Sequence, residues 1–313
     1  MEIINFGDSI KENSAVAIGT FDGVHLGHQK LLAKIREASY GKGLVPIAYT
    51  FSTHPIKENQ RRFITTLEER LYLLEKFGMK YAYLANLDES FMQLSPEEFI
   101  ERELVNKLNV KFIAVGKNFR FGYQKKGDCN TLLNLSKKFS YEVNVIEPVS
   151  VDGKLISSSL IHNLIKEGLI EEAIRFLGHT YFLQGTVNKG KGLGRKLGFP
   201  TVNVDYQNNN KLLPKIGVYI TASEVAGHLY ESITDVGFNP TFENDKKIHI
   251  ESHFMGIDGD FYGEFVRIHF LKRIRDEVKF NSAEALINQL INDVETAENF
   301  FKTNPLEVFQ AII

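Results

Sequence analysis

The pattern of apolar residues changes once along this chain, and that change constrains the fold more than any other feature of the sequence. In the first half, apolar runs alternate with helical patterns: the run Ala15–Ile18 is followed by Leu31, Leu32 and Ile35 at helical spacing. After about residue 180, strand-like runs follow one another at short spacing without helices between them. The sequence therefore predicts two domains of different structural class.

The first half predicts a doubly wound, Rossmann-like α/β domain with a parallel sheet, because its strands alternate with helices. The expected strands are residues 15–18, 44–51, 81–87, 111–116 and 142–148. Thr66 with Glu69, and Ser95 with Glu98, have the spacing of capping boxes, which predicts that two helices begin there. Ligands of such sheets bind beyond the carboxyl ends of the strands, so the segment after Ile18 is a candidate site.

The second half predicts a small antiparallel β-barrel followed by one long helix. The expected strands are residues 181–187, 201–204, 217–225, 231–236, 249–255 and 264–271. The helix is expected from an N-cap at Ser282 to about Phe301. We place the domain boundary where helical composition gives way to strands, which gives domains of residues 1–180 and 181–313.

Composition and charge narrow the class of function. A net charge of −2 does not favour a nucleic-acid-binding protein, which more often has a basic excess. No apolar stretch approaches the roughly 18 residues of a membrane span, and the N-terminus lacks the pattern of a secretory signal. The single cysteine, Cys129, suits a reducing compartment. We expect a cytoplasmic protein with small-molecule partners, and neither nucleic acid nor membrane as a partner; the oligomeric state stays open.

The segment Gly19–His28 has the features of an anion site at a strand-to-helix turn. Two imidazoles, His25 and His28, stand three positions apart at a helix start, where free backbone N–H groups and the helix dipole also favour an anion. Gly19 and Gly23 would let a nucleotide approach the backbone closely. The alternatives are a surface histidine pair or a zinc site, although neither the usual helical zinc spacing nor a third ligand is evident.

A second, different phosphate-handling pattern lies in the other half. The turn Gly190–Arg195 is rich in glycine and cations, and Pro200 precedes Thr201 and Asn203, whose side chains would share one face of a strand. Hydroxyl and amide oxygens suit Mg²⁺ that also contacts ATP phosphates. The turn does not have Walker A spacing, and such turns are often plain solvated hairpins. Two such patterns suggest one chain that uses ATP twice.

Along nearly its whole length the chain resembles the bacterial bifunctional riboflavin kinase/FMN adenylyltransferase (FAD synthetase) family. The motifs that carry the likeness are residues 19–28, 116–122, 156–162, 194–203, 237–242, 251–253 and 275–280. The resemblance implies a nucleotidyltransferase domain followed by a riboflavin-kinase barrel. It also implies ATP, riboflavin, FMN and FAD as substrates or products, with Mg²⁺ as a cofactor.

The resemblance assigns roles to individual residues. His25 and His28 would face the ATP phosphates, and Glu251 would accept the proton of the attacking ribityl hydroxyl. The residues implied in nucleotide binding are Gly19, Phe21, Gly23, Ser157, Ser158, Ser159, His162, Gly190, Lys191, Gly192 and Arg195. Those implied in flavin binding are Asn118, Phe119, Arg120, Arg275 and Glu277, and those implied in metal binding are Thr201 and Asn203.

Some of these residues also have plain structural explanations. The serines at 157–159 could simply cap a helix, Phe119 could belong to the core at a strand end, and Arg275 with Glu277 could form a surface ion pair. Glu251 alone would suit the exposed face of a half-buried strand.

Two positions depart from the family pattern. His162 stands where the family usually has arginine, and a histidine is shorter and only partly charged at neutral pH, so we expect weaker ATP binding or slower adenylyl transfer. In Phe51–Pro55 the family often has an acidic residue and proline before His54, which leaves a ligand contact and a structural turn equally open. The alternative functions are a riboflavin kinase with a weakened adenylyl site, and a non-catalytic flavin- or nucleotide-binding regulator.

Overall fold

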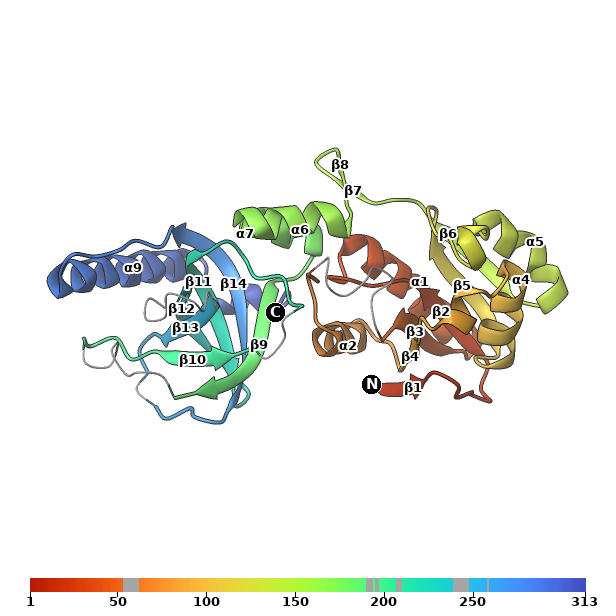
Figure 1. Cartoon of the computed structure of the whole chain (residues 1–313), viewed down its shortest axis with the longest axis horizontal. Coiled ribbons are helices and arrows are strands. Elements are labelled where there is room, and N and C mark those ends of the chain that lie inside the picture. The colour runs from red at the N-terminus through yellow and green to blue at the C-terminus, as the bar shows by residue number, and fades with distance from the viewer. Residues whose placement is uncertain (53–61, 190–193, 195–196, 207–209, 239–247, 258) are drawn as a thin grey trace. The chain divides into compact units, whose positions relative to one another are not determined.

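The computed structural model describes residues 1–52, 62–189, 194, 197–206, 210–238, 248–257 and 259–313. Its contacts divide the chain into two compact units, Met1–Ser158 and Ser159–Ile313 (Figure 1). The change from helix to strand comes where the sequence indicates it, between a helix that ends at Leu177 and a strand that begins at Tyr181. The functional boundary at residue 180 stays a prediction.

The first unit contains a six-stranded parallel sheet with the order β1-β4-β3-β2-β5-β6. Its strands are β1 (Glu2–Asn5), β2 (Ser14–Ile18), β3 (Val45–Phe51), β4 (Tyr81–Ala85), β5 (Val110–Gly116) and β6 (Glu142–Ile146). The parallel α/β prediction is confirmed, and β1 is the strand that it missed. From β2 the chain first builds outward through β3 and β4, and then returns to add β5 on the other side. The strand order therefore reverses between β2 and β5, which is where open α/β sheets bind ligands.

Helices connect the strands of this unit. They are α1 (Leu26–Lys42), α2 (Leu67–Lys76), α3 (Glu89–Met92), α4 (Pro96–Phe99), the π-helix η1 (Ile100–Asn106), the 3₁₀ turn η2 (Tyr123–Lys125) and α5 (Cys129–Phe139). Both predicted capping boxes are present, Thr66 with Glu69 before α2 and Ser95 with Glu98 before α4. A small antiparallel hairpin, β7 (Ser150–Val151) with β8 (Lys154–Leu155), follows β6.

The two faces of the sheet differ in the size of their side chains. Large residues of the strands, among them Val16, Ile18 and Tyr49, form one core with the helical segment from α4 through η1. Because strand side chains alternate, the row Ala17, Ala48, Ala82 and Ala114, which the pairing register places side by side, faces the other way. Helix α1 packs on β2, β3 and β5. Small side chains on that face let the helix approach the strands closely.

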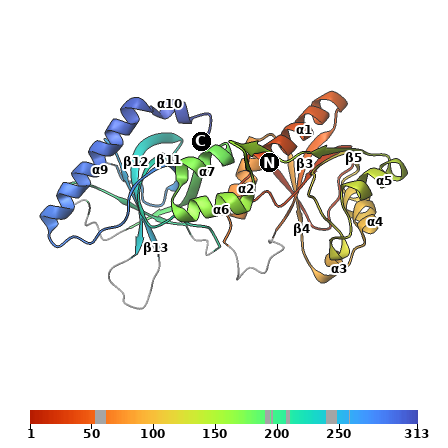
Figure 2. The ribbon, with the colours of Figure 1, turned by 90° about the horizontal axis from the view of Figure 1, so that it is seen from above.

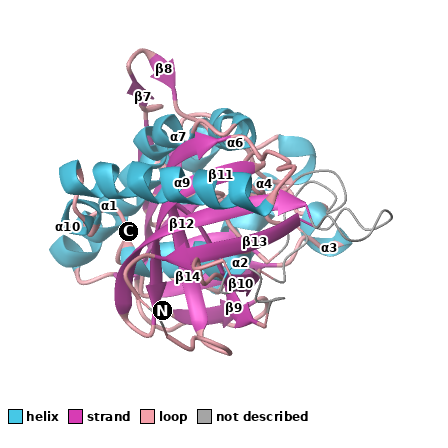
Figure 3. Ribbon diagram, turned by 90° about the vertical axis from the view of Figure 1, so that its left-hand side faces the viewer, coloured by secondary structure: helices cyan, strands magenta, loops and turns pink. Residues whose placement is uncertain are grey.

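The second unit is a closed antiparallel barrel with helices around it, as the sequence predicts (Figure 3). Its strands, in the order β10-β13-β12-β11-β14-β9, are β9 (Tyr181–Asn188), β10 (Val202–Asp205), β11 (Gly217–Val225), β12 (His228–Phe238), β13 (Ile248–Phe254) and β14 (Phe265–Arg275). Its helices are α6 (Ser158–Glu167), whose first residue still belongs to the first unit, α7 (Ile170–Leu177), α9 (Ala283–Thr303) and α10 (Leu306–Phe309). Ser282 caps α9 as predicted, and α9 and α10 flank β12 (Figure 2).

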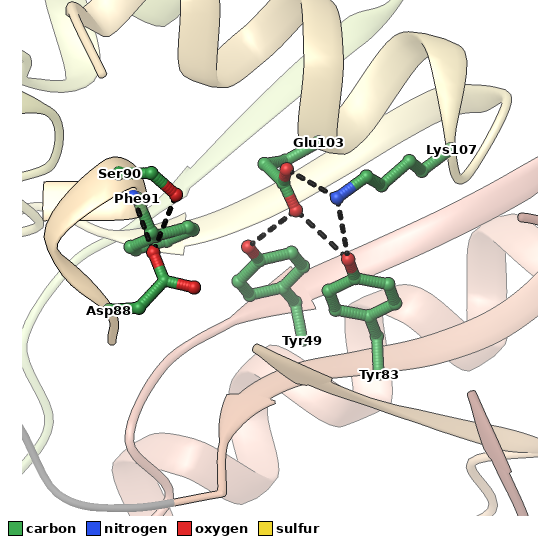
Figure 4. Close-up of polar contacts among 7 residues, drawn as sticks. All are labelled: Tyr49, Tyr83, Asp88, Ser90, Phe91, Glu103 and Lys107. Carbon is green, nitrogen blue, oxygen red and sulfur yellow. Dashed lines mark hydrogen bonds and ion pairs between the residues drawn. The ribbon is translucent and has the colours of Figure 1, made fainter. Parts of the chain in front are cut away.

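A buried carboxylate joins η1 to two strands of the first unit (Figure 4). Glu103 is 3% exposed and accepts hydrogen bonds from the hydroxyls of Tyr49 at 3.4 Å and Tyr83 at 2.9 Å. Lys107 pairs with the same carboxylate at 2.6 Å. Burial, and then the charge of Glu103, raise the pKa values of both Tyr49 and Tyr83 well above their usual value, so both hydroxyls remain donors. This cluster fixes the end of η1 against β3 and β4.

We expect Glu103→Ala to lower the free energy of unfolding of the first unit by roughly 2–4 kcal/mol, because two buried hydroxyls and an ammonium lose their partner. Chemical denaturation of the full chain measures this change. Glu101→Ala, which removes an exposed carboxylate from the same helix, is the matched control and should change little. Equal stability of the two variants would show that the cluster does not stabilise the unit.

Candidate functional site

The connection from β2 to α1 places two histidines at the start of a long helix. His25 is the N-cap of α1, and its Nδ1 atom accepts a hydrogen bond from the backbone N–H of His28 at 3.4 Å. The two imidazole rings are stacked, with centroids 3.7 Å apart and planes 14° from parallel. The ring of Phe21 meets His28 edge-on at 5.2 Å. The structure therefore brings the two predicted histidines together at a helix N-terminus.

Several contacts hold this loop in place. The Asp22 carboxylate accepts a hydrogen bond from the backbone N–H of Thr65 at 3.1 Å, and the Thr65 hydroxyl accepts one from the Gly23 N–H at 3.0 Å. Ser158, at the start of α6, donates to the carbonyl of Asp22 at 3.0 Å. Phe21 is fully buried at φ 51°, a conformation that costs energy for a residue with a side chain. A strained backbone that is held by this many partners is typical of a functional loop.

A buried arginine lies beside the same loop, and the sequence analysis did not single it out. Arg70 of α2 is 7% exposed, and it donates to the carbonyl of Thr20 at 2.8 Å and to that of Phe51 at 2.9 Å. Burial lowers the pKa of His28 well below its usual 6.5, and the charges of His25 and Arg70 lower it further. His28 is therefore neutral at pH 7 in the free protein.

The loop after β5 lies next to the histidine loop, since β5 pairs with β2. Within it, the rings of Phe119 and Phe121 stack with centroids 5.3 Å apart, and Phe121 also contacts Phe99 at 5.3 Å. Asn118 and Arg120 are exposed, and the Arg120 guanidinium reaches only the carbonyl of Phe119 among its described hydrogen-bond partners. Phe121 is buried in the core of the unit and Phe119 packs against it, so Asn118 and Arg120 are polar groups of this loop that are exposed where the strand order reverses.

The serine segment and His162 lie around the start of α6. Ser157 precedes the helix, Ser158 is its first residue, and Ser157 and Ser159 are exposed. His162 is half-buried on the same helix. The contact of Ser158 with the β2–α1 loop puts the start of this serine segment beside Asp22.

The barrel carries a second group of polar residues on three neighbouring strands. In the pairing register Asn203 of β10 lies opposite Glu251 of β13, which in turn lies opposite Asp235 of β12. Thr201 donates from its hydroxyl to the Glu251 carboxylate at 3.3 Å. The three predicted residues Thr201, Asn203 and Glu251 are thus together. Their oxygens are hard donors, which suits a magnesium ion.

A histidine that no sequence pattern singles out, His249, lies beside this group. His249 Nε2 lies 3.1 Å from an Asp235 carboxylate oxygen. Burial lowers the pKa of His249, but the hydrogen bond and charge of Asp235, with the charges of Glu251 and Glu277, outweigh this and raise it above 6.5. A Cβ on Gly237 would lie only 2.7 Å from Glu277 Oε1 and 2.8 Å from His249 Cε1, so these side chains fill the space that a glycine leaves.

Arg275 pairs with Asp293, and not with Glu277 as the surface ion-pair alternative would require. Its guanidinium binds both carboxylate oxygens of Asp293 on α9, with the shortest contact at 2.6 Å, and Asp293 is 2% exposed. Gln289 also donates to Asp293 at 2.9 Å. Arg275 therefore anchors the end of β14 to α9.

Some predicted residues lie outside the described part of the chain, namely His54, Gly190, Lys191, Gly192 and Arg195. Within the part that is described, no group of three or more histidine, cysteine or acidic side chains is arranged to hold a metal, so the zinc alternative for His25 and His28 gains no third ligand there. None of the described helices is long and apolar enough to span a membrane.

Two family models match the chain, one in each of its structural halves. A family model described as FAD synthetase matches residues 7–160, and one described as riboflavin kinase matches residues 177–301. A bifunctional riboflavin kinase/FMN adenylyltransferase of Listeria monocytogenes is 35% identical over 296 residues, which cover 92% of this chain and 93% of that protein. This chain belongs to that bifunctional family. A relative of the same name from Bacillus subtilis is 35% identical over 303 residues, covering 93% and 95% of the two chains.

A solved structure is similar to this chain over nearly its whole length. A crystal structure from Streptococcus pneumoniae, named as a macrolide-efflux protein, is 30% identical, with a TM-score of 0.85, and the match covers 96% of this chain and 99% of that one. Within the bifunctional family, the FAD synthetase model spans the His25–His28 loop and the loop after β5. The riboflavin kinase model spans Thr201, Asn203 and Glu251.

The Asp235–His249 pair makes barrel stability depend on pH. A histidine whose pKa is raised in the folded state contributes stability that is complete below its unfolded pKa of about 6.5, and that is lost as pH rises through the folded pKa. We therefore expect the melting temperature of the barrel unit to fall over that pH range, and His249→Asn to remove this part of the fall. Thermal unfolding followed from pH 5.5 to 8.5 measures it, with exposed His228→Asn as the control. The same pH dependence in both variants would contradict the assignment.

Proposed function

We propose that the chain makes both flavin cofactors: the barrel phosphorylates riboflavin to FMN with ATP, and the α/β unit then transfers the adenylyl group of a second ATP to FMN, giving FAD and pyrophosphate. The observation that carries the proposal is the presence of two chemically different sites in one chain. One presents imidazoles at a helix N-terminus, and the other presents a carboxylate beside a hydroxyl and an amide. Both family models agree with this division.

The adenylyl step needs stabilisation of negative charge more than it needs a base. The FMN phosphate is already largely ionised near neutral pH, since the second pKa of a phosphate monoester is about 6. It attacks the α-phosphorus of ATP, the bond to the β-phosphate oxygen breaks, and pyrophosphate leaves. His25, His28 and the free N–H groups of α1 would bind the oxygens on which charge grows. The neutral His28 of the free protein can gain a proton as the phosphates arrive.

The remaining residues of the first site would bind and orient the two substrates. Gly19, Phe21 and Gly23 shape the loop that approaches the nucleotide, and the serines at 157–159 offer hydroxyls and N–H groups to phosphate oxygens. Asn118, Phe119 and Arg120 would hold the flavin, because they follow β5 and so lie beside the histidine loop. His162 would contact the terminal phosphates of ATP.

The kinase step needs a base because the attacking group is a neutral ribityl hydroxyl. Glu251 would accept its proton while the hydroxyl oxygen attacks the γ-phosphorus of ATP, and ADP leaves. The hydrogen bond from Thr201 orients the Glu251 carboxylate. Glu277 lies beside Gly237 and His249, which suits a flavin contact, whereas Arg275 would act by fixing the segment that leads to Glu277. The turn that contains Gly190, Lys191, Gly192 and Arg195 would cover the nucleotide.

Magnesium is part of the proposal for both steps. Thr201 and Asn203 would hold the ion in the barrel, since a hydroxyl, an amide oxygen and a nearby carboxylate form a donor set of the kind that Mg²⁺ prefers. A bound Mg²⁺ would neutralise charge on the transferred phosphoryl group. We further propose a cytoplasmic enzyme whose partners are small molecules, with functional domains 1–180 and 181–313.

Two single substitutions should separate the activities. Glu251→Gln removes the base, so formation of FMN from riboflavin should fall about 10²–10⁴-fold, while conversion of added FMN to FAD continues. His28→Ala should lower conversion of FMN to FAD about 10²-fold or more, and leave FMN formation intact. Chromatographic separation of the flavins measures both rates in each variant. A Glu251→Gln variant with the wild-type kinase rate would remove the kinase assignment.

We expect His162→Arg to raise adenylyl-transfer kcat/KM roughly 3–10-fold, because a planar, always charged guanidinium binds phosphate better than an imidazole. The rate of FMN conversion at limiting ATP measures the change. His228→Arg adds the same group at an exposed position of the barrel and serves as the control. No gain in the His162 variant would show that this position does not limit the adenylyl step.

A further inference from the structure

The side chain of Arg70 lies at the carboxyl ends of two central strands, β2 and β3. Its guanidinium donates to the carbonyl of Thr20, two residues after the end of β2, and to that of Phe51, the last residue of β3. The side chain comes from α2, whose start is fixed by the Thr66–Glu69 capping box. Arg70 therefore ties together the two strand ends from which the histidine loop and the next loop depart.

The surroundings of Arg70 hold buried donors and acceptors without a described partner. Arg70 Nε and His28 Nδ1 are both buried, and among the described residues neither has a hydrogen-bond partner. Arg70 is 7% exposed; burial lowers its pKa, and the charges of Asp22 and Glu68 oppose this. A buried guanidinium keeps its charge, because arginine is not deprotonated in proteins. A fixed cation and an unpaired imidazole at a helix N-terminus together favour a polyanion.

We propose that Arg70 is a positioning residue for adenylyl transfer: its two carbonyl contacts set the strand ends, and its fixed charge keeps the His25–His28 pair ready for a triphosphate. This inference rests on the proposed adenylyl transfer and extends it to a residue outside the histidine loop. Arg70 acts through His28 and through the backbone of the loop, and it requires no contact of its own with the reacting atoms.

The proposal makes the charge of His28 depend on ligand binding. The described charged or titratable groups that face His28 are His25 on α1 and Arg70 on α2, with Asp22 next to Arg70. Burial, the interaction with His25 and the charge of Arg70 keep His28 neutral in the free protein. A bound polyphosphate opposes the positive charge of Arg70, so His28 should take up a proton when it binds. Affinity for a polyphosphate should therefore fall as pH rises through the titration of His28 in the complex.

The test follows the His28 ring by NMR as pH is varied, with and without inorganic pyrophosphate, in the full chain. The His28 signal is identified by its loss in a His28→Gln variant. In the wild type we expect a titration midpoint well below 6.5, which moves upward when pyrophosphate is added. In Arg70→Gln we expect a higher midpoint in the free protein, a smaller upward move, and a fall in adenylyl-transfer kcat/KM of about tenfold or more. Arg70→Lys should keep the low midpoint and recover part of the rate.

Two controls separate this inference from loss of structure and from the function itself. Riboflavin phosphorylation by the barrel of the same molecule should be unchanged, and Arg102→Gln, which removes an exposed guanidinium from the same unit, should leave both activities intact. A His28 midpoint and an adenylyl rate in Arg70→Gln equal to those of the wild type would overturn the inference. If Arg70→Gln does not fold, a wild-type His28 that fails to respond to pyrophosphate overturns it equally. A wild-type protein that makes no FAD would instead refute the proposed function.

Discussion

The short connection from β2 to α1 is the constraint on which the first unit depends. Strand β2 is buried along its whole length, so the direction in which the chain leaves the sheet is fixed before the loop begins. Thr65 and Ser158 then hold Asp22, and Phe21 accepts a positive φ angle. As a result, the N-terminus of α1, with its two stacked imidazoles, lies at the carboxyl ends of the strands. The N–H groups of the first helical turn, the helix dipole and the two rings favour an anion in that place.

The two halves of the chain use different residues because their reactions pose different problems. A phosphate nucleophile arrives ionised, and in our proposal the α/β unit would meet it with hydrogen-bond donors and positive charge. A hydroxyl nucleophile must lose a proton, which in our proposal the carboxylate of Glu251 in the barrel would accept. The parallel sheet gathers its groups at one edge, where strand order reverses. The barrel instead gathers Asn203, Glu251 and Asp235 by cross-strand pairing along one face. Each architecture thus brings together the groups that the proposed chemistry needs.

The sequence was sufficient wherever the signal is local. Periodicity located five strands of the sheet and the six of the barrel, and cap chemistry located the starts of α2, α4 and α9. The short edge strand β1 was missed, because it has no distinctive pattern of its own. The helix predicted from Ser95 is present, but its continuation as the π-helix η1 has no local signal in the sequence. Local patterns and the family likeness identified the candidate site residues His25, His28, Thr201, Asn203 and Glu251. The roles of these residues remain predictions.

Contacts between distant segments could not be predicted in this way. Arg70 is an ordinary helix residue in the sequence, and only the fold brings it to the carbonyls of Thr20 and Phe51. The same holds for His249 with Asp235 and for Arg275 with Asp293, which are joined by strand pairing and by helix packing. These pairs form only through tertiary structure, so the spacing of the residues along the chain does not predict them.

The most direct test of the central claim is a time course of the flavins formed by the purified wild-type chain with riboflavin, ATP and Mg²⁺. Two successive sites predict that FMN appears first and that FAD follows from it, with one ATP consumed in each step. FMN that is never converted to FAD would contradict the adenylyl half of the account. The absence of any product would contradict both halves.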